Sequence, residues 1–126
     1  MGTFRASIAV QNHADPRKRA DVASVLVDTG SELTWIPAST LETIGVKRVK
    51  KDMAFVTATG KTVTRSVGYA IIQCRAGRET AETIDEVVFG EPGDLALLGA
   101  RSLEGLNLTV DSRRKQLVAA GPVPAA

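Results

Sequence analysis

The sequence is poor in the residues that build disulfides, metal sites and thiol or histidine catalysis. Its 126 residues include one cysteine, Cys74, and one histidine, His13. One cysteine cannot form an internal disulfide, and one histidine by itself makes neither a metal site nor a serine–histidine catalytic pair. We therefore expect Cys74 to be a small buried apolar residue. We predict no cofactor and no metal.

Aromatic residues, net charge and long apolar runs are also scarce. Aromatics make up 4% of the chain, whereas Val, Ile and Thr recur throughout, which favours a β-rich fold over a helical bundle. The formal net charge is +2, too small to indicate a nucleic-acid partner. No apolar run could span a membrane, and the apolar stretch in residues 1–10 is too short for a signal peptide. We expect a cytoplasmic protein that binds neither nucleic acid nor membranes.

One stretch, residues 25–31 (Val-Leu-Val-Asp-Thr-Gly-Ser), stands out. A short apolar run bounded by turn residues predicts a buried strand. The run ends at Asp28, and a carboxylate removed from water is unfavourable unless its charge is held. Thr29, Gly30 and Ser31 offer two hydroxyls and the backbone N–H groups of a tight turn. The simpler alternative is a strand that ends in an Asx turn, so the motif alone is a weak signal of function.

The first half of the chain reads as hairpins and one short helix. Alternating residues predict strands over 3–11 and 21–27, joined by an exposed loop with three consecutive basic residues at 17–19. A helix is expected after Pro37, with Ser39 and Glu42 as a capping box and Gly45 as its left-handed stop. Residues 47–52 are predicted to be a charged, solvated connector. Strands over 53–58 and 62–73 flank the hairpin tip Thr59-Gly60-Lys61.

The second half repeats the order of strand, glycine and short helix. A turn over 75–78 leads to a strand over 79–89, and a loop follows at 90–94. The apolar run Leu95-Ala96-Leu97-Leu98 then ends at Gly99, and a short helix is expected over 100–106. Strands over 108–110 and 116–119 close the domain. The proline-containing tail, residues 121–126, is expected to be extended or disordered.

With these elements the chain resembles the retroviral-type (retropepsin-like) aspartic proteases of the pepsin superfamily, and in particular their single-domain bacterial members. Two motifs carry the resemblance: residues 26–31, continued by Trp35-Ile36-Pro37, and Leu97-Leu98-Gly99 before a helix with Leu103-Glu104 and Leu106. The hairpin around Gly60 stands where the family has its flap. The resemblance implies one domain over residues 1–120 with a mostly β, closed antiparallel, barrel-like fold, one or two short helices and a flap hairpin.

The chemistry of carboxylate-driven peptide hydrolysis requires two such groups. Two carboxylates close enough to share a proton cannot both ionise, so one acts as acid while the other activates water. The sequence has a single Asp-Thr-Gly, and the next candidate, Val110-Asp111-Ser112-Arg113, lacks the glycine. We therefore predict an aspartic endopeptidase that acts as a symmetric homodimer on a polypeptide substrate, with Asp28 supplied by each subunit.

The resemblance also implies roles for the residues of the catalytic turn. Asp28 carries the acid–base chemistry, and Thr29 hydrogen-bonds across the dimer. Gly30 allows a sharp turn close to the substrate. Ser31 is expected to donate a hydrogen bond to the Asp28 carboxylate, which would lower its pKa and make the activity optimum more acidic than in enzymes with Ala there.

The flap, the pockets and the supporting residues complete the expected site. The hairpin tip should close over an extended substrate and exclude water. Its residues are Ala58, Thr59, Gly60 and Lys61. The candidates for apolar side-chain pockets are Ile36, Phe55, Val56, Val63, Leu97 and, beyond these, Val67 and Leu95. Leu98 and Gly99 support the catalytic turn.

One departure from the family pattern concerns an ion pair. Retroviral enzymes commonly have Arg directly after the second-motif glycine, paired with an acid four residues after the catalytic Asp. Here the acid is Glu32, but Ala100 follows Gly99 and the arginine is Arg101, so we expect a Glu32–Arg101 pair or a dimer held differently. This departure leaves open a second reading, a protein-interaction domain of the same fold with weak or no proteolysis. A third is a β-rich nucleic-acid module that uses residues 17–19 and 47–51.

Overall fold

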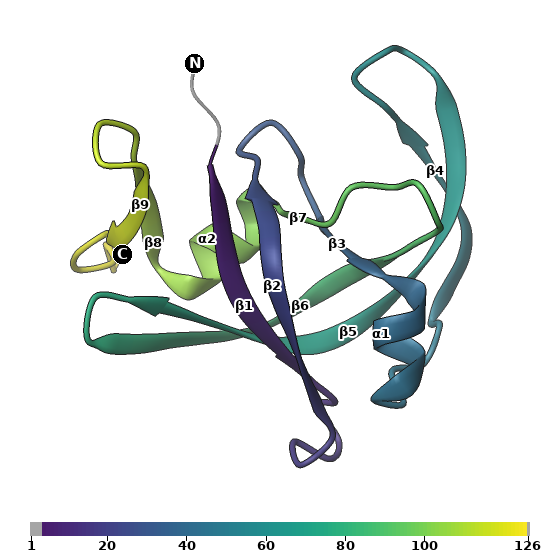
Figure 1. Ribbon diagram of the computed structural model, residues 1–126, viewed down its shortest axis with the longest axis horizontal. Helices are drawn as coiled ribbons and strands as arrows, with labels where there is room; N and C mark the ends of the chain where they lie inside the picture. Colours follow the sequence, from purple (N-terminus) through teal and green to yellow (C-terminus); the bar gives the residue numbers. More distant parts are fainter. Residues whose placement is uncertain (1–3, 126) are drawn as a thin grey trace.

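A computed structural model describes residues 4–125, so residues 1–3 of the predicted domain and residue 126 of the predicted tail lie outside the described residues (Figure 1). The described part consists mainly of strands, with two short helices, as the sequence predicts. The strands are β1 (Arg5–Gln11), β2 (Arg19–Val27), β3 (Thr34–Pro37), β4 (Lys50–Val56), β5 (Thr62–Ala76), β6 (Glu79–Gly90), β7 (Leu97–Leu98), β8 (Leu108–Asp111) and β9 (Gln116–Ala119). The helices are α1 (Ala38–Thr43) and α2 (Ala100–Leu106).

Seven strands form one sheet in the order β1-β2-β7-β3-β6-β5-β4, and β1 also pairs with β5. This extra pairing turns the sheet back on itself as a ring, with β4 outside it. Most pairs are antiparallel, but β2 with β7 and β3 with β6 are parallel. β8 and β9 form a separate hairpin after α2. The mostly β fold with two short helices is confirmed.

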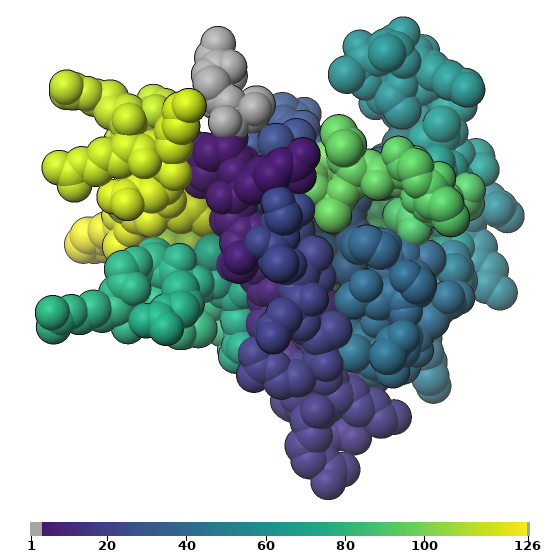
Figure 2. Space-filling model, in the orientation of Figure 1, coloured from purple at the N-terminus to yellow at the C-terminus, as the bar shows by residue number. Residues whose placement is uncertain are grey.

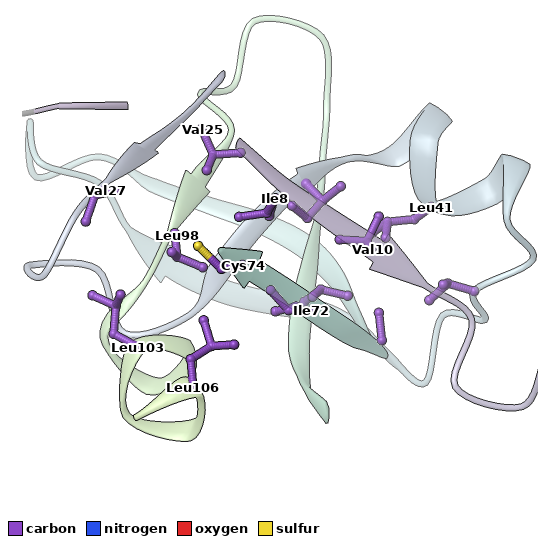
Figure 3. Packing of buried hydrophobic residues seen from close by; sticks show 14 of the residues in the cluster. Ile8, Val10, Val25, Val27, Leu41, Ile72, Cys74, Leu98, Leu103 and Leu106 are labelled. Atoms are coloured by element: carbon purple, nitrogen blue, oxygen red, sulfur yellow. The ribbon is translucent and has the colours of Figure 1, made fainter. Parts of the chain in front are cut away.

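The core lies inside this ring, where buried side chains from β1, β2, β5 and β7 meet those of both helices (Figure 3). Cys74 of β5 is 3% exposed and belongs to this core, as predicted, and burial raises the pKa of its thiol. Apolar burial of this kind stabilises the fold by about 25 cal/mol per Å². The core therefore fixes β2 and β7, the two strands that lead into the candidate site. No helix within residues 4–125 has the length and hydropathy needed to cross a membrane.

Two local predictions differ from the structure. The helix α1 begins directly after Pro37, which is its N-cap without a side-chain hydrogen bond, so Ser39 lies inside the helix and the capping box is wrong. Its predicted stop is correct, since Gly45 has a φ of 76°. The charged connector is exposed as expected, but its end belongs to β4, which begins at Lys50 and has an irregular register before Met53.

Candidate active site

The predicted catalytic turn lies where β2 leaves the sheet. Val25 and Val27 at the end of β2 are buried, and the backbone N–H of Asp28 donates to the carbonyl of Leu98 at 3.0 Å. Asp28 is half-buried, and its Oδ1 accepts a hydrogen bond from the backbone N–H of Gly30 at 2.9 Å. The chain thus presents one carboxylate at its surface, oriented by an amide of its own turn.

Gly30 leaves room for that carboxylate. A Cβ added at Gly30 would lie 3.2 Å from Asp28 Oδ1, closer than side chains usually approach. The turn itself is closed by the Ser31 N–H, which donates to the carbonyl of Asp28 at 3.2 Å. Thr29 is exposed at the tip of the turn. The close approach of the carboxylate explains why glycine suits this position.

Two predicted side-chain contacts of the turn are wrong in this structure. Ser31 Oγ donates to the carbonyl of Leu33 at 2.9 Å and not to Asp28. The Arg101 guanidinium binds Glu86, with Nη1 to Oε1 at 3.1 Å, and not the Glu32 side chain. Only the backbones of the predicted pair meet, because the Arg101 N–H donates to the carbonyl of Glu32 at 3.1 Å.

The second motif packs directly against the first. β7 lies between β2 and β3, with Leu97 paired to Leu26 on one side and to Trp35 on the other. Leu98 is fully buried. A Cβ on Gly99 would lie 2.4 Å from the carbonyl oxygen of Leu33, so only glycine fits there. The two motifs form one backbone unit at the candidate site.

The predicted flap is a hairpin formed by β4 and β5. The Thr57 N–H donates to the Lys61 carbonyl at 2.8 Å, and Gly60 has a φ of 83° at the tip. The four predicted flap residues, Ala58 to Lys61, are all exposed. Figure 1 shows the hairpin at the same end of the molecule as the loop between β2 and β3 that carries Asp28, and Figure 2 shows its tip standing clear of the body.

The predicted pocket residues divide into surface and core positions. Phe55 is half-buried and packs on Trp35 with ring centroids 5.2 Å apart, and Val63, its cross-strand partner, is also half-buried. Leu97 is half-buried, whereas Val56 and Leu95 are 76% and 58% exposed. Ile36 and Val67 are fully buried in the core. No substrate can contact Ile36 or Val67 in this structure, so their prediction as pocket residues is corrected.

Sequence reasoning did not find the contacts that tie the hairpin to the body. Arg65 on β5 donates to both carboxylate oxygens of Asp94, from Nε at 2.7 Å and from Nη2 at 3.0 Å, and its guanidinium lies 6.0 Å from the Trp35 ring centroid. This hydrogen bonding holds the pKa of Asp94 below its ordinary value of 3.8. In the sequence Arg65 looks like one more polar residue of an exposed strand. Only the folded structure shows that it pairs with Asp94.

A second charged cluster connects the base of the hairpin to α2. Glu86 on β6 accepts from Lys50 Nζ on β4 at 2.8 Å and from Arg101 on α2 at 3.1 Å. The hydrogen bond from Lys50 lowers the pKa of the Glu86 carboxyl, and Arg101 adds to the effect. Both hairpin strands are therefore fastened to the body by ion pairs.

Two other features of the described residues, metal-ligand groups and a surface cavity, lie apart from the predicted site or are absent. Residues 4–125 contain no group of three His, Cys, Asp or Glu side chains placed to hold a metal ion. A cavity of about 620 Å³ runs along β1, β2, β5 and β6, and its lining includes none of the predicted site residues. The chemistry-bearing residues lie instead at the open end that holds Asp28 and the hairpin.

Comparison with known proteins agrees with this geometry. No curated protein matches the chain. A family model described as gag-polyprotein putative aspartyl protease matches residues 20–105, about two thirds of the chain. The match includes both motifs, the hairpin between them and most of α2. The chain therefore belongs to the gag-polyprotein putative aspartyl protease family, a family of the retropepsin-like aspartic protease type.

Proposed function

We propose that this protein is an aspartic endopeptidase that works as a symmetric homodimer. The observation that carries the proposal is the Asp28 turn, which offers a single carboxylate at the surface, held by the Gly30 amide at 2.9 Å. One carboxylate cannot be acid and base at once, whereas two that share a proton can. A second copy of the chain, related by a two-fold axis, would supply the second, identical carboxylate.

In the proposed reaction the two Asp28 residues divide the proton transfers between them. The ionised Asp28 takes a proton from water as the water oxygen attacks the peptide carbonyl carbon, and the protonated Asp28 gives its proton to the carbonyl oxygen. The Asp28 that received the water proton then gives it to the amide nitrogen, while the other Asp28 takes a proton from a hydroxyl of the tetrahedral intermediate. The C–N bond breaks and releases an amine and a carboxylic acid. The titrations belong to the pair and not to either residue alone.

The substrate class follows from the surroundings of the turn. We propose an extended polypeptide that lies between the Asp28 turn and the hairpin tip, Ala58 to Lys61, which closes over it. Phe55, Val56, Val63, Leu95 and Leu97 are the apolar residues with exposed surface that remain as pocket candidates. Apolar side chains on either side of the scissile bond would bury surface against them.

The test is cleavage of an unstructured protein in mildly acidic buffer. We expect fragments from the wild-type chain, no fragments from Asp28→Asn, and inhibition by a statine-type transition-state analogue. Asp111→Asn is the matched control, since it removes a carboxylate from the β8–β9 turn and should leave cleavage unchanged. Cleavage by Asp28→Asn at the wild-type rate would overturn the proposal.

The second candidate function is a protein-interaction domain with the same fold. The observation that favours it is that Arg101 binds Glu86 and not Glu32, so the ion pair beside the catalytic turn in retroviral enzymes is not formed here within one chain. This reading predicts a stable dimer without cleavage between about pH 3 and pH 7. The same cleavage assay, run beside sedimentation, separates the two functions.

A further inference from the structure

Thr34, Ser102 and Asp85 form a polar network beside the catalytic turn, and of the three only Asp85 is partly exposed. Thr34 on β3 and Ser102 on α2 are both fully buried, and their hydroxyl oxygens are 2.6 Å apart. Ser102 Oγ donates to Asp85 Oδ2 on β6 at 2.9 Å, and the backbone N–H of Gly99 donates to Thr34 Oγ1 at 3.0 Å. Buried polar groups are unfavourable unless they are hydrogen-bonded. Removing one partner of this network would therefore leave a buried donor or acceptor unsatisfied, which destabilises the fold.

The number of available protons fixes the direction of each hydrogen bond in the network. Each hydroxyl has one proton, and an ionised carboxylate only accepts. Ser102 uses its proton on Asp85, so the short contact between the hydroxyls requires Thr34 to donate to Ser102. Thr34 Oγ1 is then free to accept from the Gly99 N–H. The hydrogen bonds therefore all point from Gly99 through Thr34 and Ser102 to Asp85, whose other oxygen accepts the Glu86 N–H at 2.7 Å.

The Gly99 end of this hydrogen-bond network contacts the catalytic turn. A Cβ on Gly99 would lie 2.4 Å from the Leu33 carbonyl oxygen and 2.9 Å from that of Ser31, so the two backbones are in close contact. On either side of Gly99, the Leu98 carbonyl accepts a hydrogen bond from the Asp28 N–H at 3.0 Å, and the Ala100 N–H donates to the Ser31 carbonyl at 2.7 Å. A shift of the segment around Gly99 must move the turn that carries Asp28.

We propose that Thr34, Ser102 and Asp85 are positioning residues, which hold Asp28 in its reactive place through the Gly99 amide. The inference rests on the proposed protease function for its catalytic consequence. None of the three side chains is expected to touch substrate. Their loss should therefore lower kcat and leave KM nearly unchanged, because a misplaced carboxylate harms the chemical step and not the binding of the peptide.

The first experiment compares Thr34→Val with its conservative rescue, Thr34→Ser. Valine keeps the shape of threonine but leaves the Gly99 N–H without an acceptor, and we expect kcat to fall about 10- to 100-fold with KM changed less than about 2-fold. Serine keeps the hydroxyl and should recover most of kcat. Ile72→Val is the control for lost stability. It removes one methylene from the core on β5, at a position outside the network of Thr34, Ser102 and Asp85. All four proteins are compared at a temperature at which each is fully folded.

The second experiment measures amide hydrogen exchange by NMR and does not depend on activity. In Thr34→Val the amides of Asp28, Gly99 and Ala100 should exchange faster than in wild type, and Ile72→Val should leave their protection unchanged. If the wild-type protein cleaves nothing, the protease proposal fails. Hydrogen exchange alone then decides whether Thr34, Ser102 and Asp85 position the catalytic turn. Unchanged protection of these amides in Thr34→Val, or a loss of kcat no larger than in Ile72→Val, would overturn the inference.

Discussion

At Asp28 the side chain that carries the proposed chemistry is held by backbone and not by a neighbouring side chain. The Gly30 N–H reaches Oδ1 at 2.9 Å, while the Ser31 hydroxyl is used by the Leu33 carbonyl. A backbone donor is fixed by the turn, so it orients the carboxylate without the entropy cost of ordering a second side chain. The Gly30 N–H thus orients the carboxylate group of Asp28 within one chain.

This geometry predicts that Ser31→Ala leaves the pH–rate profile of peptide cleavage unchanged. Its hydroxyl bonds the Leu33 carbonyl, so the substitution should only lower the free energy of unfolding, by about 0.5–1.5 kcal/mol. The measurements are kcat/KM across acidic pH and denaturant unfolding. Ser39→Ala on the exposed face of α1 is the matched control. A displaced acidic limb in Ser31→Ala but not in Ser39→Ala would show that Ser31 reaches Asp28 in the active protein.

Residue type could identify Asp28 but could not assign the partner of Ser31. A buried strand that ends in Asp-Thr-Gly is visible in the sequence because the carboxylate is costly there. The Ser31 hydroxyl, however, has two acceptors within two or three residues, and backbone geometry alone decides between them. Ile36 was likewise misassigned, since an apolar residue after the motif fits a pocket and the core equally well.

At the scale of elements, local signals predicted local structure. The hairpins around Gly60 and Gly77 follow from turn residues between alternating strands, and both glycines have positive φ. The bounds of α2, 100–106, agree with the sequence pattern. The parallel pairing of β3 with β6 and the Arg65–Asp94 pair could not be predicted, because each joins segments far apart in the chain. The ion pairs that fasten the hairpin are tertiary features of this kind.

Glu86, which joins β4 to α2 through Lys50 and Arg101, predicts a pH-dependent stability. Its pKa in the folded state is below the ordinary 4.5, so its stabilisation is present above pH 4.5 and is lost as the pH falls through the folded value. At neutral pH Glu86→Gln should be less stable than wild type by about 1 kcal/mol, a small value because both cations are partly exposed. The difference should shrink in acid.

Urea unfolding at several pH values measures this difference. Glu104→Gln, at an exposed position on α2, the helix that carries Arg101, is the control and should show no such convergence with wild type. A Glu86→Gln deficit that persists unchanged well below the pKa of Glu86 would mean that the cluster stabilises the fold by packing and not by charge.

At the scale of the whole molecule, the chain offers half of the proposed site. The Asp28 turn and the hairpin stand at one end of the sheet ring, and Asp111, the other candidate of the sequence, lies on the separate β8–β9 hairpin (Figure 1). The need for a partner follows from counting carboxylates in the sequence and from the chemistry of a shared proton. It calls for a test that depends on pairing itself.

Mixing active and inactive chains provides that test. Wild-type chains refolded together with about a ninefold excess of Asp28→Asn should retain about one tenth of their activity per wild-type chain, because random pairing places most of them beside an inactive partner. Refolding the chains together removes slow subunit exchange as a cause of a weak effect. The control is the same excess of an unrelated folded protein, which should leave activity unchanged. If the Asp28→Asn excess is equally harmless, each chain acts alone, and a single carboxylate must perform the chemistry for which the proposed dimer requires two.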